Sequence, residues 1–318
     1  MSTHRKHLRR RQGLALVSAA ALGLTLAACS TDDGGSDDAG AEGTDESTEE
    51  MADGDMGTIT LGYLPAWTDG LSMAYLADNL LTEAGYTVEH QDVQEAGLLY
   101  TALAEGDVDM YPSAWPEVTH AQYMEEYGDS IDDIGTYYDN AKLTMAVPEY
   151  TEVDSIAELA DNVDLFDGTI VGIEPGAGLT AAVQDSVIPT YGLDEAGYEL
   201  QTSSTTAMLT ELEQATEDEE DILVTLWQPF WANAAYPVKT LEDPEGALGE
   251  AEGLHFLGTS GFADEYPEAA EIIGGIQLDD TQFGTLEDLV VNENPDDPAA
   301  GVEAWLEENP DVIPMPES

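Results

Sequence analysis

The sequence predicts an α/β protein with two lobes and a ligand cleft between them. From Thr58 onward, β-prone runs alternate with segments of helical periodicity, which is typical of α/β folds with parallel sheets. About 260 residues take part, more than one hydrophobic core comfortably holds, so two domains are expected. Extended passages at 142–147 and 236–241 are the expected crossovers of a hinged pair. The expected lobe boundaries are 58–144 and 240–318 for lobe 1, and 145–239 for lobe 2.

Short apolar runs and helix-ending signals predict the individual elements. In the first half, strands are expected at 59–64, 86–93 and 108–111, and helices at 71–84, 97–105 and 116–127. Gly85 closes the first helix and Pro116 opens the third, as these residue types favour. In the second half, strands are expected at 169–173, 198–202 and 222–226, and helices at 179–191 and 205–217. A mostly helical tail is expected after residue 241.

The N-terminal segment has the pattern of a bacterial lipoprotein signal. A basic stretch at 5–11 precedes an apolar stretch at 13–26 that is too short to span a bilayer. Small residues then lead into Cys29, which resembles the acylated cysteine of a lipobox and is the only cysteine in the chain. We expect a signal peptide at 1–28 and a lipid anchor that holds the protein on the extracytoplasmic face of the cell membrane. An ordinary secretory signal with a stray cysteine is the alternative.

The rest of the chain is strongly acidic. Residues 29–57 are rich in Asp, Glu, Gly, Ser and Thr and predict a disordered linker. All 67 carboxylates follow Cys29, but only Lys142 and Lys239 of the basic residues do, so the formal charge of this part is −65. This charge excludes nucleic acid as a partner. Without arginine there is no guanidinium clamp, so an anionic ligand must use backbone N–H groups, hydroxyls or a histidine.

Three tryptophans stand at the carboxyl ends of β-prone runs. They are Trp67 in LGYLPAW, Trp115 in YPSAWPEVTH and Trp227 in DILVTLWQPFW. Open α/β sheets bind ligands at these strand ends. Several aromatic faces that converge on one point attract a desolvated cation, above all a quaternary ammonium group. The sequence therefore predicts a cation cage made by these three side chains.

A glycine-rich loop offers a second kind of contact. The run from Gly168 to Thr180 reads as a strand, a loop and a helix start, where free N–H groups attract anions. The N–H groups around Gly178 and Leu179 suit a small carboxylate, although a plain tight turn would have the same pattern. His120, close to Trp115, is expected to donate to the same carboxylate. The alternative for this residue is a surface histidine.

The sequence assigns no definite ligand-binding role to the other aromatic residues. Trp231 and Trp305 are expected to serve in packing, because each follows a helical spacing. Tyr63, Tyr111 and Tyr236 border the inferred cleft and could close the cage or simply pack.

Taken together, these segments resemble the glycine betaine/proline betaine substrate-binding proteins of ABC importers. The resemblance covers about residues 58–278 and rests on LGYLPAW, YPSAWPEVTH, GIEPGAGL and VTLWQPFW. It implies a type II periplasmic-binding-protein fold and a tryptophan prism of Trp67, Trp115 and Trp227. It also implies carboxylate contacts from Gly178, Leu179 and His120. The family's Gly-Trp-Thr-Pro-His-Trp is Leu-Trp-Gln-Pro-Phe-Trp here, which leaves the fine specificity open.

The expected function is capture of glycine betaine or proline betaine for osmoprotectant uptake through a membrane permease. Choline or carnitine is the alternative within this class, and a secreted hydrolase is a remote one. The chain has no Gly-x-Ser-x-Gly elbow and no His-Glu-x-x-His motif. We therefore expect no catalytic residue, no metal site and no cofactor.

Overall fold

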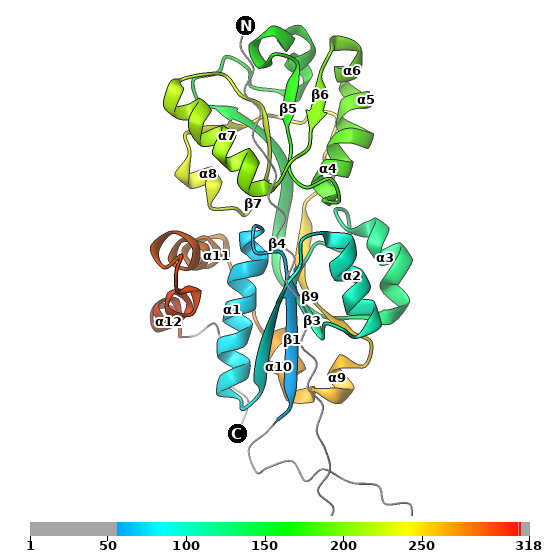
Figure 1. The fold of residues 1–318 in the computed structure, drawn as a ribbon, viewed down its shortest axis with the longest axis vertical. Helices are drawn as coiled ribbons and strands as arrows, with labels where there is room; N and C mark the ends of the chain where they lie inside the picture. Colours follow the sequence, from blue (N-terminus) through cyan, green and yellow to red (C-terminus); the bar gives the residue numbers. More distant parts are fainter. Residues whose placement is uncertain (1–55, 311, 313–318) are drawn as a thin grey trace, which may run out of the picture. The chain divides into compact units, whose positions relative to one another are not determined.

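The computed structural model describes residues 56–310 and residue 312 (Figure 1). The predicted signal peptide, the predicted lipidation site Cys29 and nearly all of the predicted linker lie outside the described residues. Among the residues that are described, no helix is long and apolar enough to cross a membrane.

In the described part of the chain, nine strands form a mixed sheet in the order β2-β1-β3-β9-β4-β7-β5-β6, with β8 paired to β4. One group consists of β1 (Thr58–Tyr63), β2 (Thr87–Asp92), β3 (Met110–Ala114) and β9 (Glu252–Thr259). A second group consists of β5 (Thr169–Val171), β6 (Glu199–Gln201), β7 (Val224–Gln228) and β8 (Val238–Thr240). Strand β4 (Ile131–Pro148) belongs to both groups.

The long strand β4 connects the two groups without a break. Its first part, from Ile131 to Ala141, pairs antiparallel with β9. From Lys142 onward it pairs antiparallel with β7, and near its end with β8. The chain therefore leaves the first group along β4, as the extended passage at 142–147 predicts. It returns to the first group after β8, by way of β9.

Helices flank each group of strands (Figure 1). With the first group lie α1 (Thr68–Glu83), α2 (Ala96–Glu105), α3 (Ala121–Tyr127), α9 (Phe262–Glu265), α10 (Pro267–Gly274), α11 (Asp280–Glu287) and α12 (Pro298–Glu308). With the second lie α4 (Gly178–Ala182), α5 (Ile188–Tyr191), α6 (Leu193–Ala196), α7 (Thr205–Asp218) and α8 (Ala232–Ala235). A π-helical stretch, Val183–Val187, joins α4 to α5, so this helix runs through the predicted range 179–191.

Helix α7 illustrates how local sequence produces these elements. Ser204 caps its first turn, since its hydroxyl accepts a hydrogen bond from the Ala207 N–H at 3.2 Å. The buried residues of the helix are Thr205, Met208, Leu212 and Ala215, whose spacing of three and four places them on one face. The opposite face is polar, as the acidic composition of the chain requires.

One expectation about the fold is wrong. The sheet is mixed rather than parallel, because β9 runs antiparallel to both β3 and β4. The tail after residue 241 is mostly helical, as expected, but it also contains β9, which lies inside the first group of strands and was not predicted. Residues of β9 are buried almost throughout, so this strand lacks the alternation of polar and apolar residues that marks a half-exposed strand.

Candidate functional site

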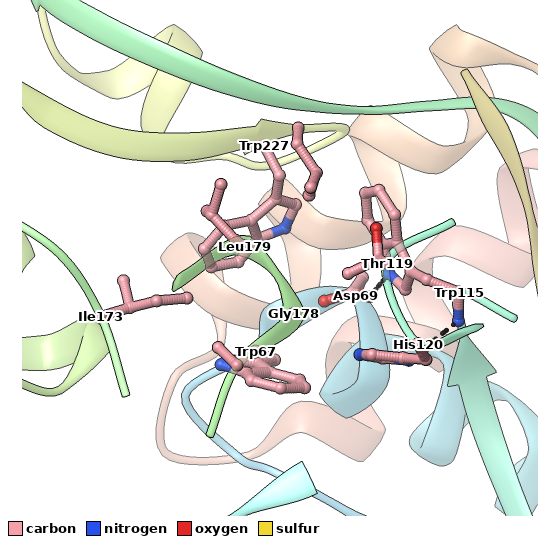
Figure 2. Close-up of a pocket in the computed structure, with 11 residues that line it drawn as sticks. Trp67, Asp69, Trp115, Thr119, His120, Ile173, Gly178, Leu179 and Trp227 are labelled. Carbon is pink, nitrogen blue, oxygen red and sulfur yellow. Dashed lines mark hydrogen bonds between the residues drawn. The ribbon is translucent and has the colours of Figure 1, made fainter. Parts of the chain in front are cut away.

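A cavity of about 30 Å³ lies where strand ends of the two groups meet (Figure 2). The first group and the segments after its strands contribute Trp67, Asp69, Trp115, Thr119 and His120, and β4 contributes Leu143. The second group contributes Ile173, Ala177, Gly178, Leu179 and Trp227. All six predicted ligand residues therefore line one cavity.

The three indoles come from three strand ends and surround this cavity (Figure 2). Trp67 follows β1, Trp115 follows β3, and Trp227 lies near the end of β7. The three residues are 9%, 5% and 5% exposed, so the aromatic wall itself is largely shielded from solvent. Such an enclosed aromatic wall attracts a desolvated cation.

Trp227 is supported from behind by Phe230. The two rings stack with centroids 4.0 Å apart and an interplanar angle of 17°. Phe230 occupies the histidine position of the motif that the sequence resembles. Here the phenylalanine adds an aromatic backing and no polar contact.

Carboxylates accept hydrogen bonds from two of the indoles. The Trp115 Nε1–H donates to Asp69 Oδ2 at 3.2 Å, and the Ser113 hydroxyl donates to the same oxygen at 2.7 Å. The Trp67 Nε1–H donates to Glu174 Oε2 at 3.3 Å. Asp69 is buried, and burial raises its carboxyl pKa, against the opposing effect of these donors. Each contact fixes an indole edge, so the face of the ring stays turned to the cavity.

The glycine loop approaches the first group very closely. A Cβ added to Gly178 would lie 2.1 Å from the Thr119 carbonyl oxygen, so no larger residue fits there. Gly178 and Leu179 open helix α4, where N–H groups lack carbonyl partners within the helix. These two N–H groups and His120 are thereby brought to the same cavity.

His120 is a neutral hydrogen-bond donor in this site. The Trp115 backbone N–H donates to His120 Nδ1 at 3.2 Å, and the Tyr100 hydroxyl lies 3.1 Å from the same nitrogen. Because a backbone N–H can only donate, Nδ1 accepts and the ring proton is on Nε2. Complete burial lowers the pKa of this imidazole to about 3. Nε2 has no hydrogen-bond partner within residues 56–310, so its N–H is free to bind a ligand oxygen (Figure 2).

Glu252 on β9 shapes the turn that carries His120. Its carboxylate accepts the N–H groups of Glu117, Val118 and Thr119 at 3.1, 2.9 and 2.9 Å. Residues 116–120 are consequently a turn, and α3 begins only at Ala121. The predicted helix start at Pro116 is therefore wrong.

Comparisons with known proteins bear on this geometry. Residues 57–308 match the family model OpuAC, described as the substrate-binding domain of ABC-type glycine betaine transport systems. The chain belongs to this family. The resemblance inferred from the tryptophan and glycine segments is confirmed.

Individual relatives agree with this assignment. The glycine betaine/carnitine transport binding protein GbuC of Listeria monocytogenes is 37% identical over 150 residues, 46% of this chain and 47% of that protein. The alignment thus spans about half the length of this curated relative. The ProX structure from Borrelia burgdorferi has a TM-score of 0.74 at 27% identity, over 81% of this chain and 97% of that one. Lactococcal OpuAC, solved closed with glycine betaine, has a TM-score of 0.71 at 28% identity, over 80% and 96%. The two-lobed type II binding-protein fold is confirmed.

The other aromatic residues lie outside the wall of this OpuAC-family cavity. Trp305 is fully buried, and its Nε1–H donates to the Gln282 carbonyl oxygen at 2.9 Å. Trp231 packs on Phe230 and Tyr236, each at 5.8 Å between centroids. The Tyr63 hydroxyl lies 3.1 Å from His90 Nδ1, and Tyr111 packs edge-on against Tyr100. All five belong to packing or to separate hydrogen-bond networks.

Sequence reasoning missed part of the wall. Leu143, Ile173 and Ala177 are apolar residues whose contribution no motif indicates. Asp69 and Glu174 could have been found, since Asp69 lies two positions after Trp67 and Glu174 lies in the glycine-rich loop, four positions before Gly178. Their partners, the indole N–H groups, are set by the tertiary fold.

A second buried carboxyl lies close behind the cage. Glu287 is 1% exposed, and its Oε1 accepts a hydrogen bond from the Thr68 hydroxyl at 2.6 Å. Burial, aided by the charge of Asp69, raises its pKa from 4.5 to about 8. The hydrogen bonds from the Thr68 hydroxyl and the Trp231 backbone N–H oppose this rise in pKa. The group therefore takes up a proton on folding at neutral pH.

This burial predicts a pH-dependent stability. Between pH 4.5 and 8 the folded state binds more protons at Glu287 than the unfolded state, so stability falls as pH rises through this window. Glu287→Gln removes this loss, and its stability relative to the unmodified chain should be higher at pH 8 than at pH 5. Urea unfolding at both pH values measures the difference. The exposed Glu293→Gln is the matched control, and an equal difference in both variants would contradict the prediction.

Proposed function

We propose that this protein is the extracytoplasmic substrate-binding component of an ABC importer, and that it captures glycine betaine or proline betaine for osmoprotectant uptake. The observation that carries the proposal is the cavity wall of Trp67, Trp115 and Trp227. Three nearly buried indoles suit a trimethylammonium group, each face contributing roughly 0.5–2 kcal/mol when desolvated. Of the residues described, neither lysine lines this cavity, so no side-chain cation competes for the cage.

Other residues that line the cavity suit a carboxylate. The N–H groups of Gly178 and Leu179 and the His120 Nε2–H are donors without charge. A neutral donor set fits a zwitterion, whose carboxylate needs orientation more than charge compensation. This combination favours a betaine over choline, which has no carboxylate. Carnitine has both groups, and the name of the Listeria relative includes carnitine, so it is the second candidate.

Transport then requires the two lobes to close on the ligand. We infer that lobe 1 comprises 58–144 and 240–318 and lobe 2 comprises 145–239, close to the change of strand pairing between Ala141 and Lys142. Closure excludes water and presents the closed form to the permease. A lipid on Cys29 would keep the protein at the membrane beside that permease. We propose no catalytic role for any residue, no metal and no cofactor.

Calorimetric titration tests the proposal directly. Glycine betaine, proline betaine, choline, carnitine and free proline are titrated into the purified chain. We expect binding of the betaines ahead of choline, and no comparable binding of proline, which lacks a quaternary nitrogen. Binding of proline without any quaternary compound would overturn the cage.

Truncation of the cage should weaken binding through the ligand and not through folding. Trp115→Ala or Trp227→Ala should each cost on the order of 1–2 kcal/mol of betaine binding, about tenfold or more. Trp305→Ala removes a tryptophan that touches no part of the cavity, so it should lower stability but spare the affinity of the folded protein. Titrations and unfolding curves on the same samples separate the two effects. Equal losses of affinity in all three variants would contradict the assignment.

The role of His120 can be separated by ligand and by pH. His120→Ala should weaken glycine betaine binding and leave choline binding nearly unchanged, because only the betaine offers a carboxylate. With a pKa of about 3 the imidazole is neutral from pH 5 to pH 8. The ratio of variant to unmodified dissociation constants should therefore be constant over this range. A ratio that shrinks as pH rises would mean that a protonated imidazole binds the ligand.

A further inference from the structure

Glu174 holds one wall of the cage from the other side of the cleft. It follows β5 in the second group of strands, whereas Trp67 follows β1 in the first. The Trp67 Nε1–H donates to Glu174 Oε2 at 3.3 Å. The same carboxylate accepts the Thr205 N–H at 2.8 Å and the Thr205 hydroxyl at 2.9 Å. All three partners are donors, so an ionised carboxylate satisfies them together.

The other two cage rings have no comparable dependence on the opposite lobe. Trp115 donates its Nε1–H to Asp69, and both residues belong to the first lobe. Trp227 is backed by Phe230, three residues along the same chain segment. Among the described residues, the one aromatic ring that packs against Trp67 is that of His120, at the longer distance of 6.0 Å between centroids. The Trp67 edge is thus fixed by a contact that exists only when the lobes are together.

The base of this contact is rigid. Thr205 is fully buried and is the first residue of α7, where its backbone N–H has no partner within the helix. The two Thr205 bonds hold the Glu174 carboxylate on the second lobe in the absence of Trp67. Its Oε2 atom is therefore preorganised to receive the indole N–H as the cleft closes.

We propose that Glu174 is a positioning residue that couples lobe closure to the orientation of the Trp67 ring against the ligand cation. This inference rests on the proposed capture of a quaternary ammonium compound. Because the contact forms on closure, its loss should increase the dissociation rate and leave the association rate nearly unchanged. Because the Glu174–Trp67 contact acts on the cation end of the ligand, its loss should weaken the binding of glycine betaine and of choline by the same factor.

Glu174→Gln is the sharpest variant. The amide oxygen can still accept the Thr205 N–H, and the Thr205 hydroxyl can turn to accept from the amide nitrogen. The Trp67 Nε1–H then faces another donor and loses its acceptor. We expect the dissociation constant of both ligands to rise about tenfold, equivalent to about 1.4 kcal/mol, with the ligand-free melting temperature unchanged. The exposed Glu211→Gln on α7 controls for removal of one negative charge and should bind normally.

A double-mutant cycle with Trp67→Phe identifies the contact. Phenylalanine has no side-chain N–H, so adding Glu174→Gln to the Trp67→Phe variant should raise the dissociation constant little further. If Glu174→Gln reduces affinity as much in the Trp67→Phe variant as in the unmodified chain, the proposal is overturned. It is also overturned if the affinity of Glu174→Gln lies within twofold of that of Glu211→Gln. A loss for glycine betaine but not for choline would also overturn it, because it would place Glu174 at the carboxylate end. If the unmodified chain binds neither ligand, the proposed function itself fails, and this inference with it.

Discussion

A cation is held by aromatic faces only where water is excluded, and this constraint governs the arrangement of the site. No single lobe of the protein provides a dry aromatic pocket. Trp67 and Trp115 come from one group of strands and Trp227 from the other, so the cage is complete only when the two groups meet. The close approach of Gly178 to Thr119 limits how near the two groups of strands can come. A side chain at position 178 would hold them apart and let water into the pocket.

The polar groups around the cavity serve this arrangement. Carboxylates accept the indole N–H groups of Trp67 and Trp115 at the ring edges and leave the faces to the ligand. His120 is kept neutral by burial and offers a donor without adding a positive charge next to the cage. In a chain with 67 carboxylates and two lysines beyond Cys29, selectivity for a zwitterion therefore depends on short-range contacts. The overall field attracts any cation, but the enclosed cavity admits one of matching shape.

Much of this could be predicted from the sequence, and the limits are physical. The tryptophans, the glycine loop and His120 are local signals at strand ends, and the α/β alternation fixes which ends they occupy. The strand β9 was missed because it is buried on both faces and has no alternating pattern. The start of α3 was misplaced because Glu252, far along the chain, accepts three N–H groups of the turn before it. The partners of Glu174 are likewise long-range contacts that no spacing encodes.

The positive charge of the ligand is the central claim, and a neutral isostere tests it most directly. In 3,3-dimethylbutanoate a carbon replaces the quaternary nitrogen of glycine betaine, so the shape and the carboxylate are kept and the cation is lost. Both compounds are titrated at about 1 M salt, where the screening length is about 3 Å and repulsion from the acidic surface is suppressed. The cation cage predicts that the isostere binds at least about tenfold more weakly than glycine betaine. Equal affinities would mean that the cavity selects shape and apolar surface, and would contradict the cation cage.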